Sequence, residues 1–225
     1  MSRAALQLLL LAALLAAPAR ADEPLVEPSS ELQFERSPVI DGTRFVCLGA
    51  GVRKKLFFSL YAIDFCVEAD AGRAQLAAYL EGPGRRHSGE RGEALVRSLR
   101  DDPEFFAYLM AMPVEKRAQL VFLRDIDRAR LHEAFLWVLV QALGEPARPS
   151  VEAFVTRLVR DVREGERLTL RTRPDGQVSA TLDADVGLRD LKLATALWQA
   201  YLGPESITPA LKDSVAEGAA GLSGR

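Results

Sequence analysis

The sequence has little of the chemistry on which metal sites and hydrolytic centres depend. Its 225 residues include only two histidines, His87 and His132, and two cysteines, Cys47 and Cys66. No H-E-x-x-H, C-x-x-C or EF-hand pattern occurs, which argues against a metal site. A G-x-S-x-G nucleophile elbow is also missing. We therefore expect no metal, no cofactor and no catalytic residue of these kinds.

An excess of one charge is missing as well. The 29 Lys and Arg residues nearly balance the 31 Asp and Glu residues. The basic segments 53–55 and 85–86 are too small for a nucleic-acid footprint, so no nucleic-acid partner is expected. The Gly-Ala-Gly at 49–51 lacks the third glycine of a dinucleotide fingerprint and leads into a strand instead of a helix, so that function is excluded too.

Residues 1–21 have the three-part pattern of a secretory signal peptide. Arg3 supplies the positive start, residues 4–17 are almost wholly apolar, and an A-x-A site ends at Ala21. The apolar run is short for a bilayer span of ~20 residues, although an N-terminal anchor remains the alternative. We expect export to the periplasm or the medium, no stable membrane anchor, and a polar lead-in over residues 22–30.

Hydrophobic periodicity in the rest of the chain predicts an α+β domain over residues 31–217, with an antiparallel sheet and helices on one side. Residues 53–55 are expected to form the turn of a first hairpin, and Pro174-Asp175-Gly176 that of a second. Residues 218–225 are expected to be a flexible tail. The expected strands are 43–51, 56–68, 116–124, 166–173 and 177–182, and the expected helices are 71–80, 92–100, 103–111, 127–143, 150–162, 187–202 and one from 208 onward.

The two cysteines lie on neighbouring strands of that first hairpin. With the turn at 53–55, Cys47 faces Tyr61, and Cys66 lies about five residues further along, which at ~3.4 Å per residue is too far for a disulfide. The two side chains would also point to opposite faces. We therefore expect two buried free thiols, with a disulfide as the alternative because export allows one.

Three segments, in this order, resemble the chalcone isomerase family. Residues 48–53 (L-G-A-G-V-R) with 61–65 (Y-A-I-D-F) are similar to its first strand pair. The pair F-F at 105–106 with P-V-E-K at 113–116, and residues 191–212 with Y-L-G and S-I-T-P, are similar to its later segments. The resemblance implies a chalcone isomerase-like open-faced antiparallel sheet with helices packed on one side and a ligand cleft between them. It also implies one of two functions, the closure of a chalcone to a flavanone or the binding of fatty acids.

The resemblance argues against chalcone closure. Arg53 matches the family's strand arginine, but Tyr61 replaces its strand threonine. The positions of its other polar groups fall on Leu131, Ala134, Val138 and Ala200. Closure needs donors that stabilise the ketone oxygen, and these four side chains cannot donate.

The binding branch fits these residues better. A guanidinium at Arg53 and a phenol at Tyr61 would hold a carboxylate. The side chains Leu131, Ala134, Val138 and Ala200 would line an apolar cleft. The sequence therefore predicts non-catalytic binding of a small apolar or aromatic acid, such as a fatty acid.

Three alternatives stay open at this point. The first alternative is that the carboxylate-binding site does not exist. In that case Arg53 is an exposed charge in a turn, or Tyr61 is an ordinary core aromatic. The protein is an isomerase or intramolecular lyase on another substrate, with an acid or base such as His132 or Glu133. The third alternative is a protein-interaction role, in which Phe135 and Trp198 fill a vestigial cleft.

Overall fold

The structure, a computed structural model, describes residues 23–81, 87 and 89–222. The predicted signal peptide over 1–21 lies outside the described residues, as does most of the predicted loop around 81–91. Within the described part of the chain, no helix is both long enough and apolar enough to cross a bilayer.

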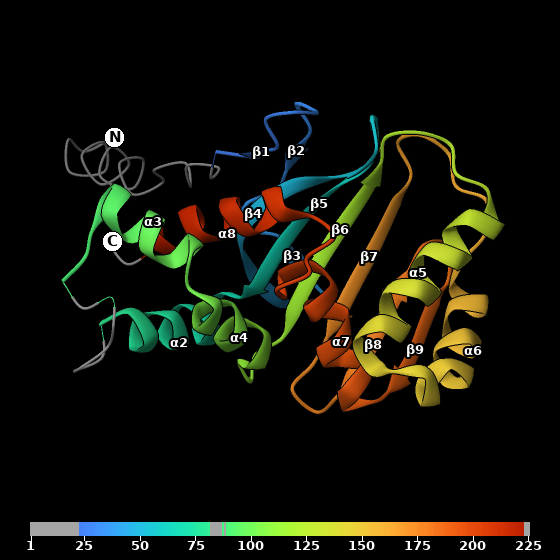
Figure 1. The fold of residues 1–225 in the computed structure, drawn as a ribbon. Coiled ribbons are helices and arrows are strands. Elements are labelled where there is room, and N and C mark those ends of the chain that lie inside the picture. Colours follow the sequence, from blue (N-terminus) through green and yellow to red (C-terminus); the bar gives the residue numbers. More distant parts are fainter. Residues whose placement is uncertain (1–22, 82–86, 88, 223–225) are drawn as a thin grey trace, which may run out of the picture.

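One curled antiparallel sheet of seven strands organises the domain (Figure 1), in the order β3-β4-β5-β6-β7-β8-β9. Every neighbour in the sheet follows its predecessor in the sequence, so the sheet is a simple meander. Its strands are β3 (Val39–Ile40), β4 (Thr43–Lys55), β5 (Phe58–Glu68), β6 (Lys116–Phe122), β7 (Arg167–Thr172), β8 (Gln177–Thr181) and β9 (Asp185–Arg189).

The helices cover one face of this sheet, as predicted. Alternate residues of β5 show why: Tyr61, Ile63 and Phe65 belong to the main core between sheet and helices, whereas Ala62 and Cys66 belong to a second core on the other face. The helices are α2 (Ala69–Glu81), α3 (Gly92–Arg100), α4 (Pro103–Ala111), α5 (Arg128–Leu143), α6 (Arg148–Leu158), α7 (Leu191–Leu202) and α8 (Pro209–Leu222), with a 3-10 turn, η1 (Glu145–Ala147), before α6.

The second core explains what the predicted polar lead-in does. Its described part contains strand β1 (Leu25–Val26), which pairs with β2 (Gln33–Phe34) as a small separate sheet. Leu25 and Phe34 pack against the outer face of β4 and β5. Between the two strands, the buried carboxylate of Glu27 accepts hydrogen bonds from Ser30. This segment is therefore ordered structure that covers the sheet.

The turn of the first hairpin lies further along than predicted. Strand β4 continues to Lys55, which pairs with Phe58, so Leu56 and Phe57 alone form the turn. The basic segment 53–55 belongs to the ladder because exposed strand residues tolerate charge, and charge by itself does not mark a turn. A bulge at Leu48 adds a further shift between Cys47 and Gly49.

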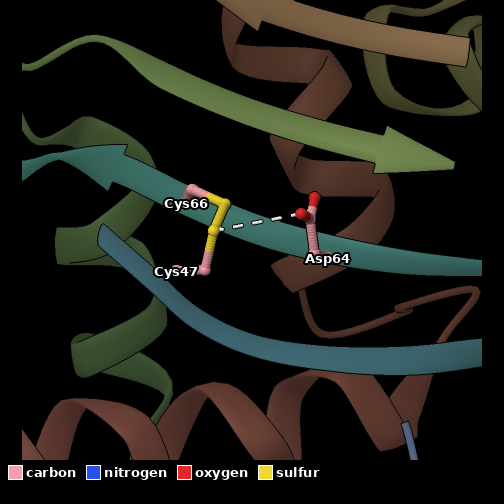
Figure 2. Close-up of side chains that lie close together, drawn as sticks. All are labelled: Cys47, Asp64 and Cys66. Carbon is pink, nitrogen blue, oxygen red and sulfur yellow. Dashed lines mark hydrogen bonds between the residues drawn. A yellow bond between two sulfur atoms is a disulfide. The ribbon is translucent and has the colours of Figure 1, made fainter. Parts of the chain in front are cut away.

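This register corrects the prediction for the cysteines. Cys47 pairs directly with Cys66, not with Tyr61, and both side chains lie on the outer face of the sheet. Their sulfur atoms form a disulfide (Figure 2). The prediction of two free thiols was wrong because it depended on the misplaced turn.

Two further elements differ from the predictions. Residues 185–189 form edge strand β9, although 187–189 were expected to begin a helix, and helix α7 starts after the N-cap Asp190. Helix α8 continues to Leu222 with Ala219 buried, so residues 218–222 are not a flexible tail. Residues 223–225 lie outside the described residues.

The Gly-Ala-Gly segment has a packing role. Helix α8 lies directly on β4, so closely that a Cβ atom built on Gly49 or Gly51 would overlap with backbone nitrogens of the helix. A Cβ on Gly218 of α8 would in turn overlap with the carbonyl oxygen of Leu48. These glycines allow the backbones of helix and strand to touch.

Candidate functional site

Arg53 and Tyr61 are direct partners across β4 and β5. They are the last pair before the register of the two strands shifts a second time, between Arg53 and Lys54. Arg53 is half-buried, and its Nη1 donates to the carbonyl oxygen of Ile207, in the loop between α7 and α8. Arg53 is therefore not a turn residue facing water, and its guanidinium is held against the helical layer.

Tyr61 reaches a second tyrosine that the sequence analysis did not select. Its hydroxyl lies 3.5 Å from the hydroxyl of Tyr201 on α7, and both rings are buried. Burial raises the pKa of both phenols, and the nearby positive charge of Arg53 opposes this only in part. Both phenols therefore stay neutral around pH 7 and can donate hydrogen bonds.

The loop after α7 adds another polar group to this end of the core. The hydroxyl of Ser206 donates to the Tyr201 carbonyl and accepts from the amide of Thr208. The Thr208 hydroxyl is buried and has no hydrogen-bond partner among the described residues. A buried hydroxyl without a partner costs free energy, so Thr208 is a candidate contact for a polar atom of a ligand.

Most of the predicted apolar wall lies in the main core. Leu131 of α5 and Ala200 of α7 are buried in the same cluster as Tyr61 and Tyr201, and Val138 packs against it from α5. Ala134 differs from the prediction: it is exposed. Helix α5 turns Leu131, Phe135 and Leu139 toward the core, so Ala134 lies on its solvent side. Ala134 therefore cannot line an enclosed cleft.

The structure does not bring the proposed acid or base to this site. The ring of His132 is hydrogen-bonded to Thr156 of α6, and it lines a shallow surface pocket with Asp127 and Asp161. Glu133 is exposed on α5.

Aromatic side chains fill part of the layer between sheet and helices. Trp198 stacks edge-on against Phe65, with ring centroids 5.3 Å apart, and donates its indole N–H to Thr172. Phe135 is also buried in this core. The protein-interaction alternative expected Phe135 and Trp198 to fill the cleft, and both are buried in this core. That alternative does not explain the polar cluster of Arg53, Tyr61 and Tyr201.

A second polar cluster lies on the opposite face of the sheet, beside the disulfide (Figure 2). The carboxylate of Asp64 lies 3.9 Å from Sγ of Cys47 and accepts a hydrogen bond of 2.7 Å from Arg117. Burial raises the pKa of Asp64 despite the ion pair with Arg117. The three side chains Cys47, Asp64 and Cys66 have the composition of a metal site. Disulfide-bonded sulfurs are not thiolate ligands, however, and the Asp64 carboxylate is already paired with the guanidinium of Arg117. These three side chains are therefore poorly suited to hold a metal ion.

Tyr201 and Thr208 were missed although both lie in segments that carried the family resemblance. Tyr201 is 140 residues from Tyr61 in the sequence, and only the packing of α7 on the sheet brings them together. The available signal was the Y-L-G and S-I-T-P segments themselves, which contain Tyr201 and Thr208.

Comparison with known proteins defines the class of this fold. No known family model matches the sequence, and no curated protein is similar enough to match it. Among solved structures, the chain is similar to a fatty-acid binding protein of Arabidopsis thaliana, with a TM-score of 0.71 and 18% sequence identity. The match covers 90% of this chain and 100% of the Arabidopsis chain. The protein is thus an α+β protein built on a curled antiparallel sheet with one helical face. Its fold is the chalcone isomerase-like fold, as the sequence motifs predicted.

Proposed function

We propose that this protein binds a small apolar acid, such as a fatty acid, without catalysis. Arg53, Tyr61 and Tyr201 hold the carboxylate, and the apolar layer between sheet and helices holds the tail. The observation that carries the proposal is the meeting of one guanidinium and two buried neutral phenols at the edge of an apolar core. The Arabidopsis protein, which has the same fold, is a fatty-acid binding protein, and this supports the proposal by analogy.

The chemistry of the three donors selects an anion over a neutral ligand. A guanidinium presents a planar fork that matches a carboxylate, and hydrogen bonds to a charged group contribute ~1.5–3 kcal/mol each. A phenolate would repel the ligand, but the raised pKa values of Tyr61 and Tyr201 keep both hydroxyls protonated. The Thr208 hydroxyl is a further candidate donor to the same group.

The test compares saturated fatty acids with their methyl esters. The purified mature chain is analysed by native mass spectrometry and solvent extraction for a co-purified acid, and then titrated calorimetrically with both series. We expect the affinity for the acids to rise with chain length. The esters should bind at least ~10-fold more weakly, because they lack the negative charge that would pair with the Arg53 guanidinium.

Variants locate the site. Arg53→Gln should weaken acid binding by about 10- to 100-fold, and Tyr61→Phe by about 3- to 10-fold, with no effect of either on ester binding. Arg130→Gln serves as the matched control, because Arg130 is an exposed arginine on α5. If the protein is purified without a bound acid and binds neither the acids nor the esters, the proposal is wrong and the protein-interaction alternative is favoured.

We also propose that the chain is exported and that residues 1–21 are removed. The signal-like pattern of these residues motivates the proposal, and the disulfide supports it because such bonds persist in oxidising compartments.

A further inference from the structure

The end of the β4–β5 hairpin carries a cluster of exposed apolar side chains. Three consecutive residues of this hairpin tip, which we define as residues 54–58, are unusually accessible: Leu56 is 84%, Phe57 98% and Phe58 56% exposed. Single exposed apolar residues are ordinary on soluble proteins, whereas contiguous large ones mark a surface that contacts something apolar.

The backbone presents these side chains outward. Leu56 and Phe57 form a two-residue turn, and Leu56 has a positive φ of 55°, a conformation that glycine or asparagine usually occupies in hairpins. Lys55 pairs with Phe58 and Lys54 with Ser59, so the ladder continues up to the turn. A bulky residue at a strained position, with its side chain in water, gains nothing from the fold itself, and strain of this kind concentrates at functional sites.

Positive charge surrounds the apolar tip. Lys54 and Lys55 are exposed immediately before it, and the guanidinium of Arg124 lies 4.7 Å from the centroid of the Phe58 ring. Two exposed acidic residues lie in the adjoining loops, Asp125 and Glu164, and both keep their negative charge because only the backbone amide of Glu164 donates to the Asp125 carboxylate. The three cations Lys54, Lys55 and Arg124 outnumber these two carboxylates, so in a chain of net charge −2 this end of the hairpin is locally basic.

We propose that the hairpin tip docks reversibly on a membrane surface that contains anionic lipids. Leu56 and Phe57 enter the interface between headgroups and acyl chains, and Lys54 and Lys55 contact the lipid phosphates. Aromatic and aliphatic side chains flanked by lysines are the composition of membrane-interface segments. A two-residue turn is also too narrow for the roughly 800 Å² per partner that a stable protein interface needs, which favours a lipid surface over a second copy of the chain.

The position of the tip links it to the proposed ligand site, and in this respect the inference rests on the proposed function. Arg53 directly precedes Lys54 on β4, and Tyr61 follows Phe58 on β5 by three residues. Fatty acids partition into bilayers, so docking by the tip places the carboxylate-binding end of the protein beside the source of its ligand.

The first experiment is flotation of the mature chain with vesicles of phosphatidylcholine, with or without phosphatidylglycerol. We expect binding to the mixed vesicles and weakening by added salt. Phe57→Asp should reduce binding at least ~10-fold. The double variant Lys54→Glu with Lys55→Glu should bind mixed vesicles no better than pure phosphatidylcholine.

Matched controls separate the tip from general surface effects. Val39→Asp replaces an exposed apolar residue on β3, and Arg157→Glu with Lys192→Glu reverses two exposed charges on α6 and α7. Both controls should float like the unchanged protein. Phe57→Trp should show a blue-shifted emission with vesicles and quenching by brominated lipid. Failure of the unchanged protein to float, flotation of Phe57→Asp at the original level, or an unquenched Phe57→Trp would each overturn the proposal.

Two further readouts keep this inference distinct from the function on which it rests. Phe57→Asp should bind fatty acids in solution with unchanged affinity. Normal fatty-acid binding without vesicle binding would overturn the docking surface alone, and vesicle binding without fatty-acid binding would overturn the ligand site alone. A concentration-dependent dimer that Phe57→Asp dissociates, with no vesicle binding, would assign the tip to self-association and overturn the lipid proposal.

Discussion

Lys116 is a buried cation that lies apart from the proposed site. It begins β6, its ammonium group donates to the carbonyl oxygen of Met112, and burial lowers its pKa from its usual value near 10.5 to about 8. Because desolvation penalises the charged form, the folded state releases this proton more readily than the unfolded chain. The charged lysine is therefore destabilising at neutral pH.

This shift predicts a pH dependence with a definite sign. Between pH 8 and 10.5 the unfolded chain binds the Lys116 proton and the folded chain does not. Its contribution to the free energy of unfolding therefore rises with pH across that window, by on the order of 3 kcal/mol in total. Lys116→Met should remove this rise. Urea unfolding of both proteins from about pH 7 to 10 measures the difference, with Lys192→Met as an exposed control, and equal pH slopes for the original chain and Lys116→Met would contradict the prediction.

Candidate site residues could be selected from the sequence only where a local motif contained them. Arg53 and Tyr61 could be selected because motifs within one hairpin carried the family resemblance. Tyr201 and Thr208 could not be selected in the same way, since their proximity to Arg53 depends on how α7 and its following loop pack on the sheet. The cysteine prediction failed because one misplaced turn changes every pair in a ladder.

Helix α8 and strand β4 are two elements whose backbones touch. Gly218→Ala would place a methyl group on top of the Leu48 carbonyl oxygen, a contact that only displacement of the helix relieves. We expect this substitution to lower the free energy of unfolding by about 1–3 kcal/mol or more. Chemical denaturation followed by circular dichroism measures it.

The same helix provides the control. A Cβ built on Gly221 meets no atom within 4 Å, so Gly221→Ala adds helix propensity without a clash. It should leave stability unchanged or raise it by up to ~1 kcal/mol. If both substitutions gave the same change, the close contact between helix and strand would not be the cause.

Most elements were predictable from periodicity, and the exceptions have local reasons. Strand β9 is a short edge strand of five residues, and its sequence joins directly to α7, so a single helical pattern covered both. The N-cap Asp190, which accepts hydrogen bonds from the amides of Lys192 and Leu193, was the available signal for the true start of the helix.

The whole molecule combines a predicted leader with a disulfide, and this combination is testable. A chain produced with residues 1–21 and exported should begin at Asp22 and contain no free thiol when titrated under denaturing conditions. Removal of the disulfide in Cys47→Ala with Cys66→Ala should lower the free energy of unfolding by ~3 kcal/mol, the chain-entropy value for a loop of this size. Recovery of an uncleaved chain, or of a chain with two free thiols, would contradict the export proposal.

The fold class was accessible from the sequence because it depends on patterns that repeat along the whole chain. Strands and helices in the right order, together with three ordered motifs, predicted the α+β layout that the structural match confirms. The wall of the predicted cleft was harder to specify. It depends on the rotation of α5 about its own axis, and that rotation places Ala134 in solvent while Leu131 stays buried.

The glycines between β4 and α8 also have a mechanical consequence. Where two backbones touch, no side chain is available to change rotamer, so strand and helix move only together. On the other side of the domain, α5 and α7 pack through buried side chains such as Phe135 and Trp198, and Trp198 contacts Phe65 of β5 and Thr172 of β7. Such side chains can repack. For the proposed ligand, this means that expansion to admit an acyl chain would occur between α5, α7 and the sheet, while β4, which carries Arg53, stays fixed against α8.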